Sequence, residues 1–173
     1  KKVLVTGHTG FKGSWLVTWL NMLGCKVLGV SLDPIKGDNH FKILKKNLDI
    51  IDKRGDIRNE RYLKIIIKQF KPDIVFHLAA QAIVSTSYSH PKLTFETNVL
   101  GTFNLLSVLA ELKHKCIAIF ITSDKCLKIE LEIPIQDFRY MCFVSQINAM
   151  SKIEKRNCAK LELGILQQKS ETE

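Results

Sequence analysis

Three glycines near the start of the chain are spaced to hold a phosphate group. They recur at every third residue, directly after the apolar run 3–6 and ahead of a helical pattern. A strand, a glycine-rich turn and a helix N-terminus in that order present backbone N–H groups to a pyrophosphate. Gly7 would permit the tight turn, Gly10 would let the phosphates approach the backbone, and Gly13 would let the helix lie close to the strand. The predicted phosphate-binding residues are Gly7, Thr9, Gly10, Phe11, Lys12 and Gly13.

Predicted strands and helices alternate along the first 125 residues, and they would position this turn. Further strands are expected at 26–30, around Ile50 and Ile51, at 74–78 and at 116–121, and helices at 60–70 and at about 91–112. The strands are apolar without alternation, which is typical of a parallel sheet covered by helices on both faces. We therefore predict an α/β fold, a Rossmann-like doubly wound parallel sheet with strand order 3-2-1-4-5. Its ligand would lie beyond the carboxyl ends of the strands.

Helical periodicity also predicts which side chains face the core. In the helix after the glycines, Trp15, Leu16, Leu20 and Leu23 are expected on one face. In the long helix, the residues expected to point inward are Val99, Leu100, Phe103, Leu106 and Leu109.

Composition narrows the class of protein. The chain has 173 residues, of which 46% are apolar and 25% charged, as in a single globular domain. The formal net charge is +9, but the lysines are scattered and no arginine–aromatic platform accompanies them, so we expect no nucleic-acid partner. The five cysteines form no C-x-x-C pair, which predicts neither a metal site nor a disulfide framework and favours a reducing, cytoplasmic setting. No signal peptide is recognised, and no apolar run reaches the roughly 18 residues that cross a membrane.

Ordered motifs at the strand ends together carry a family resemblance. They are the glycine turn, Gly55-Asp56-Ile57-Arg58, His77-Leu78-Ala79-Ala80-Gln81, Ser87-Tyr88-Ser89-His90-Pro91, Thr97-Asn98-Val99-Leu100-Gly101-Thr102 and Thr122-Ser123-Asp124-Lys125-Cys126. From Lys2 to Cys126 the chain resembles the extended short-chain dehydrogenase/reductase family. Its sequence at 8–15 and 123–126 is most similar to that of the CDP-glucose 4,6-dehydratase branch.

The resemblance implies a reaction and its catalytic residues. NAD would take a hydride from C4 of CDP-glucose, water would leave across C5 and C6, and the hydride would return to C6. Ser123 would hydrogen-bond the C4 oxygen, and Asp124 with Lys125 would form the acid–base pair of the elimination. The implied partners are a nucleotide-sugar substrate and, through the helix at 91–112, a second copy of the chain in a possible homodimer.

The resemblance also assigns the cofactor-binding residues. Asp56 and Ile57 would hold the adenine, and Leu78, Ala79 and Ala80 would line the trough for the dinucleotide. Ser31, by its position at the end of the second strand, takes the slot of the residue that binds the ribose 2′-hydroxyl, with Asp33 two residues later. NAD is therefore the expected cofactor, with NADP left open. Asn98 is either a helix-bending polar residue or part of the site.

Beyond Cys126 the resemblance ends. The family's Tyr-x-x-x-Lys pair falls on Asn148 and Lys152, and an amide cannot act as the base at C4. Lys152 would still hold the nicotinamide ribose. We therefore expect an NAD-binding Rossmann domain at 1–126 and a divergent segment at 127–173, with the sheet incomplete on its C-terminal side and no substrate domain. Such a truncated or frame-shifted chain would have little or no activity. The alternatives are a non-catalytic dinucleotide-binding module and another nucleotide-sugar epimerase or dehydratase.

Overall fold

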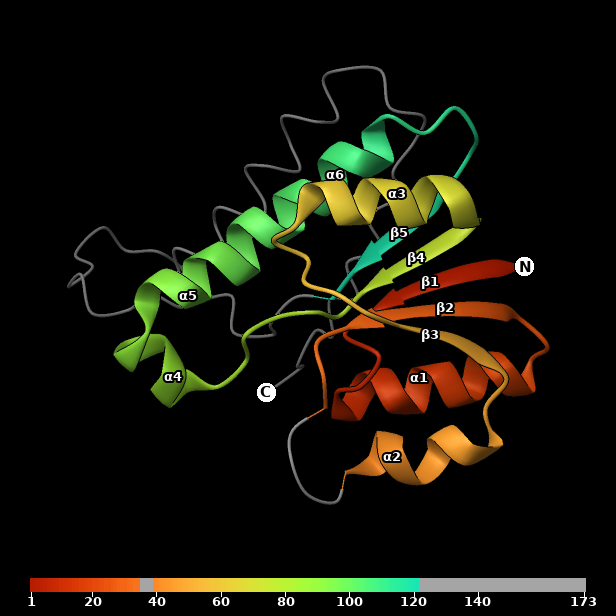
Figure 1. Ribbon diagram of the computed structural model, residues 1–173, viewed down its shortest axis with the longest axis horizontal. Coiled ribbons are helices and arrows are strands. Elements are labelled where there is room, and N and C mark those ends of the chain that lie inside the picture. The colour runs from red at the N-terminus through yellow and green to blue at the C-terminus, as the bar shows by residue number, and fades with distance from the viewer. Residues whose placement is uncertain (35–38, 122–173) are drawn as a thin grey trace, which may run out of the picture.

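The computed structural model describes residues 1–34 and 39–121, which form a five-stranded parallel sheet in the order β3-β2-β1-β4-β5 (Figure 1). The predicted fold class and strand order are thus confirmed. The strands are β1 (Lys2–Thr6), β2 (Lys26–Ser31), β3 (Ile50–Arg54), β4 (Ile74–His77) and β5 (Ile117–Phe120). The α-helices are α1 (Phe11–Met22), α2 (His40–Leu44), α3 (Glu60–Phe70), α4 (Val84–Ser89), α5 (Pro91–Phe95) and α6 (Gly101–Ala110).

Strand register gathers the predicted site at one edge. β1 is central, and Thr6 at its carboxyl end lies opposite Val30 of β2 and His77 of β4. On the outer side of β2, Ser31 lies opposite Arg54 of β3. Because all the strands run in the same direction, the turns that follow them meet at this edge.

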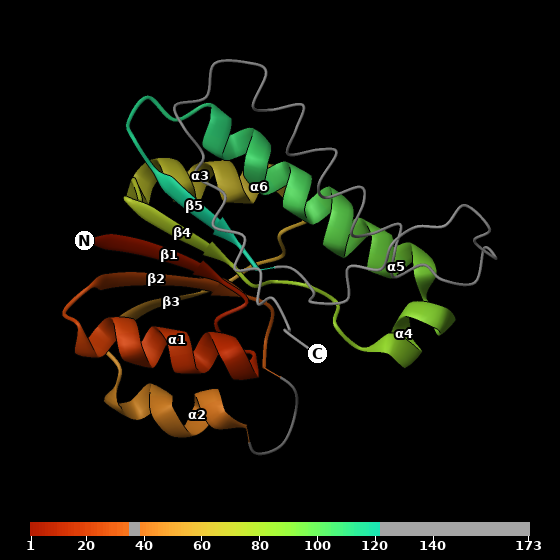
Figure 2. The ribbon, with the colours of Figure 1, turned by 180° about the vertical axis from the view of Figure 1, so that it is seen from behind.

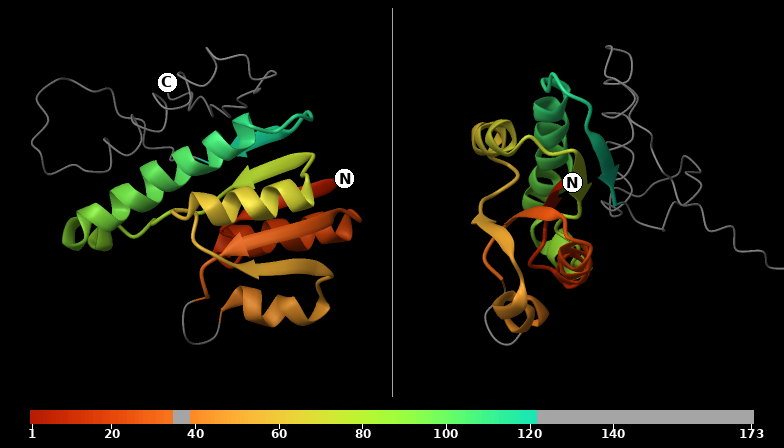
Figure 3. Two further views of the ribbon diagram at one scale, coloured as in Figure 1. Left: turned by 45° about the horizontal axis from the view of Figure 1, so that its top comes forward. Right: turned by 90° about the vertical axis from the view of Figure 1, so that its right-hand side faces the viewer.

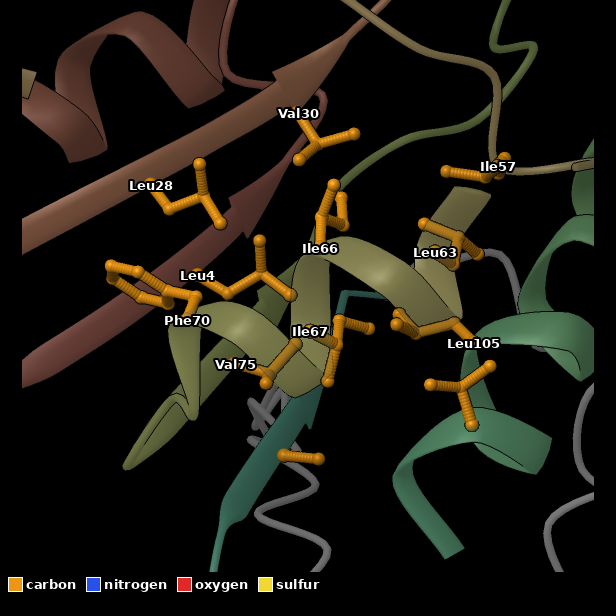
Figure 4. Close-up of a cluster of buried hydrophobic side chains, with 12 residues drawn as sticks. Leu4, Leu28, Val30, Ile57, Leu63, Ile66, Ile67, Phe70, Val75 and Leu105 are labelled. Carbon is orange, nitrogen blue, oxygen red and sulfur yellow. The ribbon is translucent and has the colours of Figure 1, made fainter. Parts of the chain in front are cut away.

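One face of the sheet is covered by α3 and α6, and the other by α1 and α2 (Figures 1 and 2). Under α3 and α6 lies an apolar core (Figure 4): Leu4, Leu28, Val30, Ile57, Leu63, Ile66, Ile67, Phe70, Val75, Leu105, Val108 and Ala118. Helix α3 begins at its predicted residue because the Asn59 side chain accepts a hydrogen bond from the N–H of Tyr62 at 3.0 Å. Its apolar residues then fall on one face, as predicted.

The prediction for α1 was wrong for Trp15 and Leu23. Both are exposed, and the face toward the sheet consists of Gly13, Ser14, Val17 and Leu20. Helix α1 carries apolar residues around most of its circumference, so periodicity alone did not identify the inner face. Small residues face inward because the helix lies close to β1 and the glycine turn.

The predicted long helix is present but contains a π-helical turn. Figure 3 shows α5 continuing into α6 as one helical run, and the π turn Glu96–Leu100 joins them. Leu106 is buried as predicted, whereas Leu100 and Phe103 are exposed, contrary to the prediction. The wider turn changes the helical phase, and the inward face of α6 is formed by Gly101, Thr102, Leu105, Leu106 and Val108.

Candidate functional site

The glycine turn is shaped by close approach of neighbouring backbone. Gly7 has φ +73°, and a Cβ atom there would lie 2.7 Å from the backbone nitrogen of Ala79. A Cβ atom on Gly13 would overlap the carbonyl oxygen of Gly7. The Gly7 N–H donates to the Val30 carbonyl at 2.8 Å, which fixes the turn between β1 and β2. Gly7 and Gly13 are therefore required by the fold itself.

Gly10 is different, because it is exposed and a Cβ atom there would have a single close neighbour. It is the exposed N-cap of α1, with φ −71°, and the nearest atom to a Cβ there would be the Gly7 oxygen at 3.3 Å. Phe11 and Lys12 are exposed and lie in the first turn of α1, so their N–H groups have no acceptor inside the helix, and no side chain caps this end. This open cradle before a helix N-terminus fits a pyrophosphate.

The edge predicted to hold the ribose lies between the glycine turn and β2. The hydroxyls of Thr9 and Ser31 are 2.6 Å apart, and Ser31 is only 9% exposed. Thr9 Oγ1 also lies 3.4 Å from the Leu32 carbonyl, to which it can donate. Ser31 is the last residue of β2, and its hydroxyl is already engaged by Thr9.

A buried histidine ties the glycine turn to β3. His8 has no exposed surface, and its Nε2 lies 2.9 Å from Asp52 Oδ1. Its ring fills the space above Gly29, where a Cβ atom would come within 2.5 Å of it, and meets Phe41 edge-on at 4.9 Å. A carboxylate only accepts hydrogen bonds, so Nε2 carries the hydrogen when His8 is neutral. Burial lowers the pKa of His8 and outweighs the opposing effect of Asp52. The lowered pKa favours the neutral form of the ring.

Asp52 is the centre of an ion cluster on β3. Lys45 Nζ lies 2.6 Å from its Oδ2, and Arg54 Nη1 lies 2.9 Å from its Oδ1. Burial acts to raise the pKa of Asp52, but hydrogen bonds from Lys45 and His8 and the charge of Arg54 outweigh it and hold the pKa below its usual range. Asp52 therefore remains ionised beneath the glycine turn.

At the predicted adenine edge, Asp56 and Ile57 are placed differently. The Asp56 carboxylate accepts from the Arg58 backbone N–H at 2.9 Å and from Arg58 Nη2 at 2.6 Å, and hydrogen bonding to this guanidinium lowers the pKa of Asp56. The Ile57 side chain is 4% exposed and occupies the space beside Gly101. A ligand at this edge could therefore reach the backbone of Ile57 but not its side chain.

The predicted trough after β4 is supported by a buried polar chain. Thr6 Oγ1 lies 2.7 Å from His77 Nδ1, and His77 Nε2 lies 2.9 Å from Thr102 Oγ1. Complete burial lowers the pKa of His77 to about 4. The Thr6 hydroxyl also accepts from the N–H of Ala79 at 3.2 Å. These contacts hold the start of the segment Leu78–Ala80, in which Leu78 and Ala79 are half-buried and Ala80 is exposed.

Asn98 clamps the same segment from the π turn. Its Oδ1 accepts from the Gln81 N–H at 2.7 Å, and its Nδ2 donates to the Gln81 carbonyl at 3.0 Å. Of the two readings of Asn98, the geometry thus gives it a structural task at the site edge. π turns are frequent at functional sites.

Sequence reasoning missed the cluster of His8, Asp52 and Arg54. The available signal was a pair of opposite charges two residues apart in a short predicted strand, together with a histidine inside the glycine turn. The catalytic candidates Ser123, Asp124 and Lys125, and also Lys152, lie outside the described residues. Within residues 1–34 and 39–121 no group of side chains could hold a metal ion. No helix in this part of the chain is long and apolar enough to cross a membrane.

Comparison with known proteins identifies relatives of this arrangement. The family model of GDP-mannose 4,6-dehydratase matches residues 4–126. A CDP-glucose 4,6-dehydratase of Salmonella typhimurium is 46% identical over 127 residues, which cover 73% of this chain and 35% of that protein. The chain thus spans about a third of the length of this relative.

Solved structures agree with the fold. UDP-glucose 4-epimerase of Thermotoga maritima, in a structure with UDP-glucose, matches with a TM-score of 0.73 and 26% identity over 90% of this chain and 52% of that one. The Thermus thermophilus UDP-glucose 4-epimerase, in complex with NAD, matches with a TM-score of 0.65 and 26% identity over 90% of this chain and 50% of that one. The chain belongs to the GDP-mannose 4,6-dehydratase family, among the extended short-chain dehydrogenases/reductases.

Proposed function

We propose that this chain binds NAD over the carboxyl edge of its sheet, with the pyrophosphate at the N-terminus of α1. The observation that carries the proposal is the contrast within the turn. Gly7 and Gly13 are closed against neighbouring backbone, whereas Gly10 is open in front of backbone N–H groups. The NAD complex of the Thermus thermophilus relative supports the choice of cofactor.

We infer that the substrate is a nucleotide sugar and that the ancestral reaction is the 4,6-dehydration of CDP-glucose. The 46% identity to a CDP-glucose 4,6-dehydratase supports this reaction over those of a CDP-paratose 2-epimerase and a UDP-glucose 4-epimerase, which are 35% and 33% identical to the chain. When bound, NAD would accept and return the hydride. Ser123 would hold the C4 oxygen, and Asp124 and Lys125 would move the protons of the elimination. Lys152 would hold the nicotinamide ribose, while Asn148, at the tyrosine slot, would leave C4 without its base.

The cofactor proposal is tested by calorimetric titration of ADP-ribose into the full chain. Gly10→Val should abolish measurable binding, because the branched side chain would occupy the phosphate cradle. Gly10 does not have a positive φ, so the variant should still unfold cooperatively. Lys113→Val, at an exposed site near the amino end of β5, is the matched control and should bind as the unmodified chain does. Equal binding by Gly10→Val and the unmodified chain would refute the proposal.

The catalytic proposal is tested separately by incubating the chain with CDP-glucose and NAD. We expect no detectable 4-keto product, since loss of a general base alone costs roughly 10²–10⁴-fold. Binding of ADP-ribose without turnover would support the reading as a non-catalytic module. Ready turnover would contradict the assignment of Asn148 and leave the cofactor proposal intact.

A further inference from the structure

The end of β3 carries an arginine beside the ribose edge of the site. Arg54 lies opposite Ser31 in the strand register, and the Gly55 N–H donates to the Ser31 carbonyl at 3.0 Å. In a Rossmann fold, an acidic residue at the end of the second strand binds the ribose 2′-hydroxyl, whereas an arginine nearby accommodates a 2′-phosphate. Arg54 therefore lies where a choice between these two ribose forms is made.

In this chain the guanidinium of Arg54 is already engaged. Nη1 and Nη2 contact Oδ1 and Oδ2 of Asp52 at 2.9 and 3.0 Å, in the two-pronged geometry that arginine forms with carboxylates. Its Nε lies 3.3 Å from Asp33 Oδ1, and its Cζ lies 5.6 Å from the centroid of the Phe41 ring. Asp33 thus covers the edge of the guanidinium that Asp52 leaves free.

The charges of this cluster are balanced. Asp33 and Asp52 face Arg54 and Lys45, and burial favours the neutral form of His8. A phosphate monoester brings a charge of about −1.5 to −2. Among the described residues of this cluster it would meet no unpaired cation, and it would approach the Asp33 side chain, which is 87% exposed.

We propose that Asp33 is the specificity-determining residue for the adenosine ribose, and that it favours a free 2′-hydroxyl over a 2′-phosphate by occupying Arg54 and by repelling the phosphate. The inference rests on the proposed function, since it needs the dinucleotide at this edge. It moves the role expected of Ser31 to Asp33, because the Ser31 hydroxyl is held by Thr9.

The test compares ADP-ribose with 2′-phospho-ADP-ribose, titrated into the full chain at low ionic strength. In Asp33→Asn we expect the affinity for the 2′-phosphorylated ligand to rise about tenfold. The affinity for ADP-ribose should stay within about twofold, because the 2′-hydroxyl carries no charge. Asp33→Glu keeps the carboxylate and should show no gain.

Two further variants separate a local effect from a change in net charge. Asp49→Asn removes the same charge at the exposed residue before β3, at the other end of the sheet, and should leave both affinities unchanged. Asp33→Asn combined with Arg54→Met should lose the tenfold gain. If that double variant does not fold, the salt dependence of the Asp33→Asn gain replaces it, because a gain carried by Arg54 must shrink as salt rises.

The outcomes distinguish this inference from the proposal beneath it. If Asp33→Asn changes neither affinity, or raises both equally, Asp33 does not determine specificity and the cofactor assignment still stands. If the unmodified chain does not bind ADP-ribose, the proposed function is wrong, and this inference, which depends on it, is wrong as well.

Discussion

The face of the sheet under α3 and α6 and the face under α1 and α2 bury different kinds of residue. Beneath α3 and α6 the buried cluster is apolar, and the buried polar residues Thr6, His77 and Thr102 lie beside it at the carboxyl end of the sheet. Beneath α1 and α2 the apolar cluster is smaller. The buried His8 packs against Phe41 of this cluster and is hydrogen-bonded to Asp52. The first face mainly stabilises the fold. The second face buries fewer apolar residues, and its polar contact between His8 and Asp52 fixes the glycine turn.

A matched pair of leucine substitutions should show the largest difference between the faces. Leu63→Ala in α3 and Leu20→Ala in α1 delete the same atoms, and such changes cost about 2–5 kcal/mol. Leu63 is fully buried in the larger cluster, so its loss should lie near the upper end of that range, and that of Leu20 near the lower end. Urea unfolding of both variants measures the difference. An equal or larger cost at Leu20 would contradict the comparison.

Acid should destabilise the fold through the buried histidines. The folded-state pKa of His77 is about 4, below its usual 6.5, so between these values the unfolded chain binds a proton that the folded chain does not. The stabilisation is therefore complete above pH 6.5 and is lost as the pH falls toward 4, by about 3 kcal/mol for His77. His8, whose pKa is also lowered, acts in the same direction on the other face.

Urea unfolding at several pH values between 7.5 and 4.5 checks this expectation. His77→Gln should flatten the profile more than His8→Gln does. If these variants do not fold, the NMR titration of His77 in the unmodified chain decides instead, and a midpoint near 6.5 would refute the assignment.

A smaller effect is expected from the clamp on the segment after β4. Asn98→Ala removes both hydrogen bonds to Gln81 and should cost about 1 kcal/mol. Asn104→Ala is the matched control, since Asn104 donates to the carbonyls of Ile57 and Arg58 and does not contact Gln81. Amide hydrogen exchange should show faster exchange at Gln81 in Asn98→Ala alone. Unchanged protection at Gln81 would mean that other contacts hold this segment.

The smallest effect is expected on the outer side of α1. Trp19 is 62% exposed, so Trp19→Gln should change the free energy of unfolding by less than about 0.5 kcal/mol. Leu20→Ala, one residue away on the inner side, provides the contrast. A cost above 1 kcal/mol at Trp19 would mean that the outer side of α1 is covered in solution.

Local patterns were sufficient to predict the bounds of α3 and the glycine turn, because the Asn59 cap and the glycine spacing act between near neighbours in sequence. The sheet order joins distant strands, and it was predicted from the alternation of strands and helices together with the known topology of doubly wound folds. Sequence patterns did not reveal the orientation of α1, since its apolar residues surround the helix, or the π turn, which has no periodic signal. The cluster of His8 and Asp52 joins residues 44 positions apart, so only the folded register brings it together. The catalytic assignments at 123–125 and Lys152 remain predictions.

The π-helical turn at Glu96–Leu100 also constrains how the length of this region can change in evolution. A π turn holds one residue more than the α-helical path needs. Deleting one residue there would leave a regular α-helix, whose backbone conformation is lower in free energy than a π turn. Each position upstream of the deletion would then turn by about 100° relative to α6. A protein with this deletion would have either Asn98 turned away from Gln81 or the apolar side of α6 turned away from the core. The extra residue of the π turn should therefore be retained in every relative in which Asn98 holds Gln81.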